Sequence, residues 1–352
     1  MRSLTFVVGT GRSGSTALSR IVNAHPEVLS LNEFLASLGS RALPAEPVDG
    51  AEFWRLLADP NPVFNTMIRS GMPMPEFLYE PGAGRRYAAG TTGIPALSLM
   101  TLPHLTDDPD GLLDELAEQV TRWPRRPAPG HHRALFDVLG ARFGGRTAVV
   151  ERSGYSAHWV PRLRAAFPEA RFVHLFRDGP DCALSMSRHP GYRMISLLRE
   201  IQALTGTANP GELAEEQGRS LPPELSGLLA DPFDPALVRE RPLPVPGFGA
   251  LWSEIVTEAA GHLEGVPGEQ WTPLGYEELL AAPRRELTRL AEFIGVKPLP
   301  EWLDAGSAHL DSGRRGASLR LPPGELAELR ERCAPGVRAL RASGARVEGA
   351  AG

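Results

Sequence analysis

Residues 4–16, Leu-Thr-Phe-Val-Val-Gly-Thr-Gly-Arg-Ser-Gly-Ser-Thr, decide the fold of this chain. The first five are apolar or β-branched, which predicts a buried strand. Leu18, Ile21 and Val22 then share one face of a predicted helix. A strand, a glycine-rich turn and a helix N-terminus together form an anion site, because backbone N–H groups converge there and the helix dipole favours negative charge. A plain connecting turn is the alternative.

The glycine-rich segment nearly fits the Walker A pattern, G-x-x-x-x-G-K-[ST]. Gly9, Gly14 and Thr16 occupy fixed positions of that pattern, but Ser15 stands where the lysine is required. An NTPase uses this lysine to reach the β- and γ-phosphates. Arg12 is the cation of the loop, and its guanidinium stays charged and can grip one short phosphate-bearing group. The loop is therefore predicted to bind a phosphate ester without a Walker lysine.

A second anion site is predicted after residues 170–176, Ala-Arg-Phe-Val-His-Leu-Phe, which have the pattern of another buried strand. Arg177 ends this strand, at the carboxyl edge where open α/β sheets bind ligands. Asp178 or Gly179 can cap the helix that follows, and Ser185 lies about two turns into that helix. Two anion sites at two strand ends suit a nucleotide that is phosphorylated at both its 5′ and 3′ positions.

Both segments resemble motifs of the sulfotransferases that use PAPS (3′-phosphoadenosine 5′-phosphosulfate). In that family the 5′-phosphosulfate loop has Lys or Arg before Ser-Gly-(Ser/Thr)-Thr, and the 3′-phosphate segment is Arg-Asp-x-x-x-x-x-x-Ser, as in residues 177–185. The resemblance implies a three-layer α/β fold of the P-loop type, with a central parallel sheet and helical insertions. It implies PAPS as donor and the desulfated nucleotide PAP as product. The donor-binding residues that it assigns are Gly11, Arg12, Ser13, Gly14, Ser15, Thr16, Arg177 and Ser185.

The resemblance also indicates a general base. In the tyrosylprotein-type branch, to which the motif spacing is closest, a glutamate in the segment after the phosphosulfate loop is the base. Residues 25–33, His-Pro-Glu-Val-Leu-Ser-Leu-Asn-Glu, resemble that segment and end at Glu33. A capping or surface glutamate is the alternative. The cytosolic branch uses a histidine, so His104, His131 and His132 are further candidates.

Three more positions follow from the same resemblance. Arg152 ends a predicted third strand, where relatives have Glu-Lys-(Thr/Ser)-Pro and the lysine contacts the transferring group; a surface ion pair with Glu151 is the alternative. Tyr276, in Tyr-Glu-Glu-Leu, is expected either at the nucleotide or in packing. Arg314 belongs to a basic segment, residues 312–318, that resembles the loop closing over the 3′-phosphate; a solvated turn is the alternative.

Composition and charge limit the partners, location and cofactors that we expect for this protein. The 352 residues have a formal net charge of −5, which gives no electrostatic reason to expect nucleic acid or an anionic membrane as partner. The first strand begins near residue 4 and no apolar run reaches about 18 residues, so we expect neither a signal peptide nor a membrane span, and a cytoplasmic, bacterial protein. Two cysteines form no disulfide framework. The nine histidines are scattered, with His131 and His132 expected in a solvated loop, so no metal site is predicted.

We expect one sulfotransferase domain over residues 1–352. Its parts are a sheet-forming core (1–35, 146–190 and 248–297), a mostly helical insertion (36–145), an irregular insertion (191–247) and a closing C-terminal segment (298–352) whose last helix spans about 323–333 and which frays beyond Val347. The two insertions are expected to form an acceptor pocket. Its candidate lining residues are Phe64, Met67, Met72, Met74, Phe77, Tyr79 and Tyr192.

The predicted reaction is direct, in-line transfer of a sulfuryl group from PAPS to a hydroxyl of a small-molecule, glycan or peptide acceptor. Glu33 would take the hydroxyl proton, while Arg12 and Arg152 offset the charge on the bridging oxygen. The identity of the acceptor and the oligomeric state stay open. Two other functions compete: an NTP-dependent small-molecule kinase, which the missing lysine disfavours, and a non-catalytic nucleotide-binding module.

Overall fold

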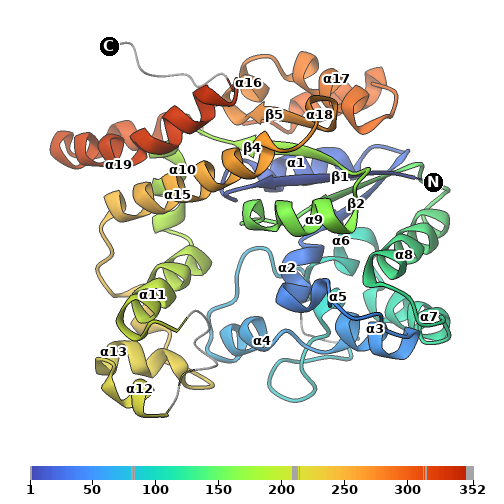
Figure 1. Ribbon diagram of the computed structural model, residues 1–352, viewed down its shortest axis with the longest axis horizontal. Helices are drawn as coiled ribbons and strands as arrows, with labels where there is room; N and C mark the ends of the chain where they lie inside the picture. Colours follow the sequence, from blue (N-terminus) through green and yellow to red (C-terminus); the bar gives the residue numbers. More distant parts are fainter. Residues whose placement is uncertain are drawn as a thin grey trace.

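The computed structural model describes residues 2–80, 82, 84–207, 213, 215–311, 313 and 315–345. Within these residues one sheet of five parallel strands has the order β2-β3-β1-β4-β5 (Figure 1). The strands are β1 (Ser3–Gly9), β2 (Val28–Asn32), β3 (Ala148–Arg152), β4 (Arg171–Phe176) and β5 (Trp271–Gly275). Because β1 lies at the centre, the glycine-rich loop leaves the middle of the sheet.

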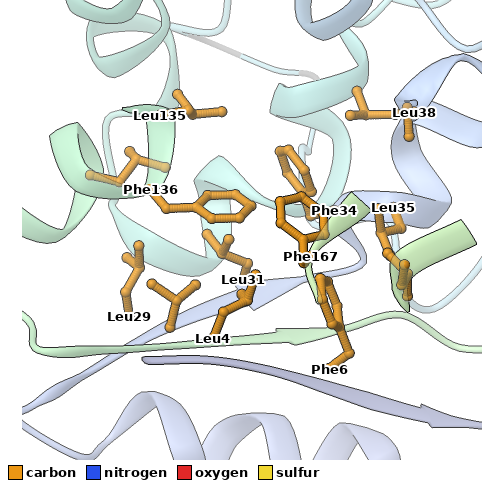
Figure 2. Close-up of a cluster of buried hydrophobic side chains, with 14 of the residues drawn as sticks. Leu4, Phe6, Leu29, Leu31, Phe34, Leu35, Leu38, Leu135, Phe136 and Phe167 are labelled. Atoms are coloured by element: carbon orange, nitrogen blue, oxygen red, sulfur yellow. The ribbon is translucent and has the colours of Figure 1, made fainter. Parts of the chain in front are cut away.

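Helices cover both faces of this sheet (Figure 1). Successive strand residues point to opposite faces, so Phe6 and Val7 of β1 belong to different hydrophobic clusters. Figure 2 shows the cluster of Phe6, in which its ring lies 5.6 Å from that of Phe167 and which also includes Phe136. Val7 packs on the opposite face with Leu18 and neighbouring helical residues. Burying each such side chain stabilises the folded state by about 1.5–3 kcal/mol.

The remaining elements lie between and after the strands. Those before β3 are α1 (Ser15–Asn23), α2 (Phe34–Leu38), the 3-10 helix Gly39–Ala42, α3 (Gly50–Ala58), α4 (Pro62–Arg69), α5 (Ala96–Met100), α6 (Leu102–Leu105), α7 (Pro109–Val120) and α8 (Ala128–Arg142). Those between β3 and β5 are the 3-10 helix Ala157–Trp159, α9 (Val160–Ala166), α10 (Gly179–Ser187), α11 (Pro190–Thr205), α12 (Glu215–Ser220), α13 (Pro223–Ser226), the 3-10 helix Gly227–Leu229, α14 (Ala236–Arg239), α15 (Val245–Glu264) and the 3-10 helix Gly268–Gln270. Those after β5 are α16 (Tyr276–Ala281), α17 (Pro283–Ile294), α18 (Pro300–Ala308), the 3-10 helix Ala317–Arg320 and α19 (Pro323–Ala342).

The structure confirms the predicted fold class, an α/β fold with a central parallel sheet between helical layers. The expectation of an irregular segment over 191–247 is wrong, because α11 to α14 occupy much of it. Prolines there stand at helix starts, as Pro223 and Pro246 do, where the helix does not need the missing N–H as a donor. The division into core, insertions and closing segment stays a prediction.

The last helix is also longer than expected. It continues through Pro335 to Ala342, because Leu329, Cys333 and Leu340 pack with residues of α15 such as Trp252. Val347 and the rest of the predicted frayed end lie outside the described residues.

Candidate active site

Every strand delivers one candidate residue at its carboxyl end. The loop after β1 carries Arg12, Glu33 follows β2, Arg152 ends β3, Arg177 follows β4 and Tyr276 follows β5. Because the strands are parallel, these ends meet at one edge of the sheet. A cavity of about 370 Å³, here called the donor cavity, lies at this edge. Of the predicted site residues, it is lined by Arg12, Gly14, Ser15, Thr16, Arg152, Arg177, Ser185 and Tyr276.

The loop holds its shape through positive φ angles at Gly11 (66°), Arg12 (55°) and Gly14 (83°). A side chain at Gly14 would place its Cβ 2.2 Å from the ring of Tyr276, so that position admits only glycine. Ser13 is buried, and its hydroxyl lies 2.9 Å from the Thr10 hydroxyl. The Ser13 side chain therefore braces the loop from within and does not line the donor cavity.

Arg12 joins the two predicted anion motifs. Its Nε donates to the Ser185 hydroxyl at 3.3 Å, and its Nη1 lies 3.1 Å from Oε1 of Glu76. Glu76 also accepts from His189 Nε2 at 3.1 Å; the other ring nitrogen, Nδ1, accepts the N–H of Gly191. Burial alone would raise the pKa of Glu76, but the His189 hydrogen bond and the nearby positive charges outweigh it and lower that pKa.

Arg177 is held in place before any ligand binds. Its guanidinium lies over the ring of Tyr276, 5.3 Å from the centroid, and its Nη2 is 3.4 Å from Asp181. Asp181 also accepts the N–H groups of Gly316 (2.7 Å) and Ser318 (2.9 Å). Asp181 thus ties the segment after α18 to the predicted 3′-phosphate arginine. Arg314, which was predicted to close over that phosphate, lies outside the described residues.

Glu33 and Arg152 form a buried ion pair at the carboxyl ends of β2 and β3. Arg152 also donates to the side chain of Asn32, and the Gly154 N–H donates to Glu33 Oε2 at 2.9 Å. Glu33 has a φ of 53° and stands at the N-cap of α2, but its side chain makes no capping hydrogen bond. The alternatives of a capping Glu33 and a surface pair between Arg152 and Glu151 are therefore wrong.

A second cavity of about 500 Å³, here called the acceptor cavity, lies beside the first. Arg12, Ser15 and Glu76 line both cavities, and Glu33 lines the acceptor cavity. Four of the predicted lining residues are present: Phe64, Met67, Met74 and Tyr192. The other three pack in hydrophobic clusters instead: Met72, Phe77 and Tyr79. Lining residues that the sequence did not indicate include Met100, Met194, Ile195 and Leu198.

The three histidine candidates for the general base lie in different surroundings. His104 lines the donor cavity, and burial, helped by the charges of Arg152 and Arg20, lowers its pKa to about 4. His131 and His132 are buried in α8, where they lie 2.8 Å from the Val48 carbonyl and 2.6 Å from the Ala42 carbonyl, respectively. They line neither cavity. Because both are buried in a helix, the expectation of a solvated loop is wrong.

Glu151 is a buried carboxyl beside the site. Its Oε1 accepts from the Leu35 N–H at 3.1 Å and from the Ser153 hydroxyl at 2.6 Å, whereas Oε2 has no partner within the described residues. Burial outweighs these hydrogen bonds and raises the pKa of Glu151 to about 7.

This raised pKa makes stability depend on pH. A carboxyl whose pKa rises from 4.5 to about 7 on folding stabilises the folded state below pH 4.5, and this contribution is lost as the pH rises through 7. One pKa unit corresponds to about 1.4 kcal/mol, so the loss is about 3 kcal/mol. We expect Glu151→Gln, which stays neutral, to unfold like the wild type at pH 4.5 but to be more stable by about that amount at pH 8. Urea unfolding at both values measures this, and identical pH dependence in the two proteins would contradict it.

In the part of the chain that the structure describes, no group of three or more His, Cys, Asp or Glu side chains is placed to hold a metal ion. None of the described helices combines the length and the apolar character needed to cross a membrane.

No protein-family model matches the chain, and no curated protein matches it. Three solved structures are similar to it over 99% of its length. They are the sulfotransferase domain from the curacin biosynthetic pathway (15% identity, 99% of that chain covered, TM-score 0.48), the sulfotransferase domain from the Synechococcus PCC 7002 olefin synthase (13%, 97%, 0.42) and a sulfotransferase from Alicyclobacillus acidocaldarius (18%, 98%, 0.41). The tyrosylprotein-type branch stays a prediction.

Proposed function

We propose that this protein transfers a sulfuryl group from PAPS to a hydroxyl group of an acceptor. The observation that carries the proposal is the pair of adjoining cavities with different chemistry. The donor cavity is lined by four arginines: Arg12, Arg20, Arg152 and Arg177. The acceptor cavity has mainly apolar walls and meets the donor cavity at Arg12, Ser15 and Glu76. Transfer between two bound substrates needs two sites that adjoin in this way, because the reacting atoms must be held in contact.

The donor would contact the donor cavity at both of its charged ends. The 5′-phosphosulfate would lie in the loop at the N-terminus of α1, against Arg12, Ser15 and Thr16. The 3′-phosphate would lie against Arg177, which is already held by Asp181 and Tyr276 and so loses little freedom on binding. Arg12 differs, because its contacts with Glu76 and Ser185 must be exchanged for contacts with the donor.

The transfer step uses the ion pair between the two cavities. The acceptor oxygen bonds to sulfur while the bond from sulfur to the 5′-phosphate oxygen breaks and leaves its electron pair on that oxygen. The acceptor proton passes to the carboxylate of Glu33. A protonated Glu33 no longer neutralises Arg152, whose charge is then available, with that of Arg12, to the departing phosphate.

Radiolabelled PAPS, offered with a panel of hydroxyl compounds, tests this function. We expect label to move to an acceptor even when a metal chelator is present. The control is Arg12→Ala, in which we expect turnover to fall by about 10²-fold or more, because one fixed cation facing the bridging oxygen is lost. Transfer of phosphate from magnesium ATP, with none of sulfate from PAPS, would contradict the proposal and favour a kinase.

A further inference from the structure

We propose that the acceptor is an alcohol whose single hydroxyl is carried on an apolar skeleton, and not a sugar or a glycan. This inference rests on the proposed sulfuryl transfer and narrows the substrate class of the same site. It comes from the acceptor cavity, whose volume of about 500 Å³ is that of a small-molecule pocket.

The walls of the acceptor cavity are apolar over most of their length. Helices α4 and α11 provide two sides, and further residues come from α5 and from the segment after α4. The apolar side chains of these segments include Phe64, Met67, Met74, Met100, Ile195 and Leu198. A polyol that lies along these apolar side chains would lose water from several hydroxyls and gain few partners in exchange, which is unfavourable. A hydrocarbon chain or ring would gain from the same burial.

The two ends of the acceptor cavity differ in exposure. Glu33 is 5% exposed and marks its inner end, which meets the donor cavity at Arg12. Four exposed lining residues mark its mouth: Ser40, Val63, His158 and Arg162. An acceptor that enters through this mouth with its hydroxyl leading places that hydroxyl against Glu33 and leaves the rest of the molecule on the apolar walls. The hydroxyl proton then passes to Glu33, as in the proposed transfer.

A series of linear primary alcohols, from butanol to decanol, tests the proposal with radiolabelled PAPS as donor. A buried methylene contributes about 0.8 kcal/mol, so we expect kcat/KM to rise about fourfold for each added methylene until the cavity is filled. Glucose and short oligosaccharides should be sulfated at least about 10²-fold less efficiently than decanol. Efficiency that does not change with chain length, or that favours the sugars, would overturn the proposal.

Two variants of α11 form a matched pair. Leu198 is half-buried in the cavity wall, whereas Leu204 is 60% exposed and lies outside the wall. We expect Leu198→Gln to raise KM for decanol about tenfold, with little change in kcat, and Leu204→Gln to behave as wild type. The midpoint of thermal unfolding verifies that both variants fold. Equal KM values for the two folded variants would overturn the assignment of the wall.

The affinity for PAP separates this inference from the proposed function. PAP binds in the donor cavity, so both variants and the wild type should bind it equally. If the wild type binds PAP and sulfates sugars but not alcohols, the acceptor class is wrong and sulfuryl transfer stands. If the wild type neither binds PAP nor turns over PAPS with any acceptor, the proposed function itself fails.

Discussion

Glu33→Gln is expected to lower kcat for sulfuryl transfer by about 10²-fold or more, while PAP binds at least as tightly as to the wild type. An amide accepts no proton at this position, so general-base assistance is lost. PAP should still bind, because Glu33 lines the acceptor cavity and its ion-pair partner Arg152, which lines the donor cavity, keeps a charge that the amide no longer neutralises. Single-turnover kinetics and calorimetry with PAP measure the two quantities separately.

Glu76→Gln is the matched comparison for this prediction. Glu76 is the other carboxylate that lines the acceptor cavity, and its oxygens accept from Arg12 and His189. Its pKa is lowered, which makes it a weak base. We expect this change to have a smaller effect on kcat than Glu33→Gln. Near-normal turnover of Glu33→Gln would remove Glu33 as the base, and a larger loss in Glu76→Gln would transfer that role to Glu76.

Arg177→Ala is expected to weaken PAP binding by about 10²-fold. The variant loses a charged, forked donor at the proposed 3′-phosphate site, and such an interaction is worth about 2–3 kcal/mol. The fold should survive, because Asp181 keeps its hydrogen bonds from Gly316 and Ser318. Calorimetry with PAP measures the loss, and thermal unfolding verifies the fold.

Adenosine 5′-phosphosulfate, which has no 3′-phosphate, is the matched ligand for Arg177→Ala. Its affinity should be the same in the variant and in the wild type, because the lost arginine would have nothing to contact. Arg177→Lys keeps the charge without the planar fork and should bind PAP with intermediate affinity. An equal loss of affinity for both nucleotides would show that Arg177 does not recognise the 3′-phosphate.

The sequence was sufficient for the parts of the site that follow local patterns. Arg12, Glu33, Arg152, Arg177 and Tyr276 each end or follow a short strand, and parallel strands bring their ends to one edge. Glycines marked the loop, and its positive φ angles at Gly11 and Gly14 explain why they are needed. Fold class could be predicted for the same reason, since the apolar strands and their helices are local features.

Long-range packing was not predictable in this way. Glu76 lies in a segment without a recognisable motif, and only the folded chain brings it to Arg12, 64 positions away. The burial of His131 and His132 depends on contacts of α8 with residues such as Phe53. The prolines of 191–247 resembled breakers of structure, although Pro223 and Pro246 stand in the first turns of helices.

The central claim is that two arginine sites grip the two phosphorylated ends of one adenosine nucleotide, and calorimetry with PAP and with ATP tests it most directly. The account predicts tight binding of PAP and at least about 10²-fold weaker binding of ATP, which has no 3′-phosphate for Arg177 to contact. No detectable binding of PAP together with clear binding of ATP would contradict it.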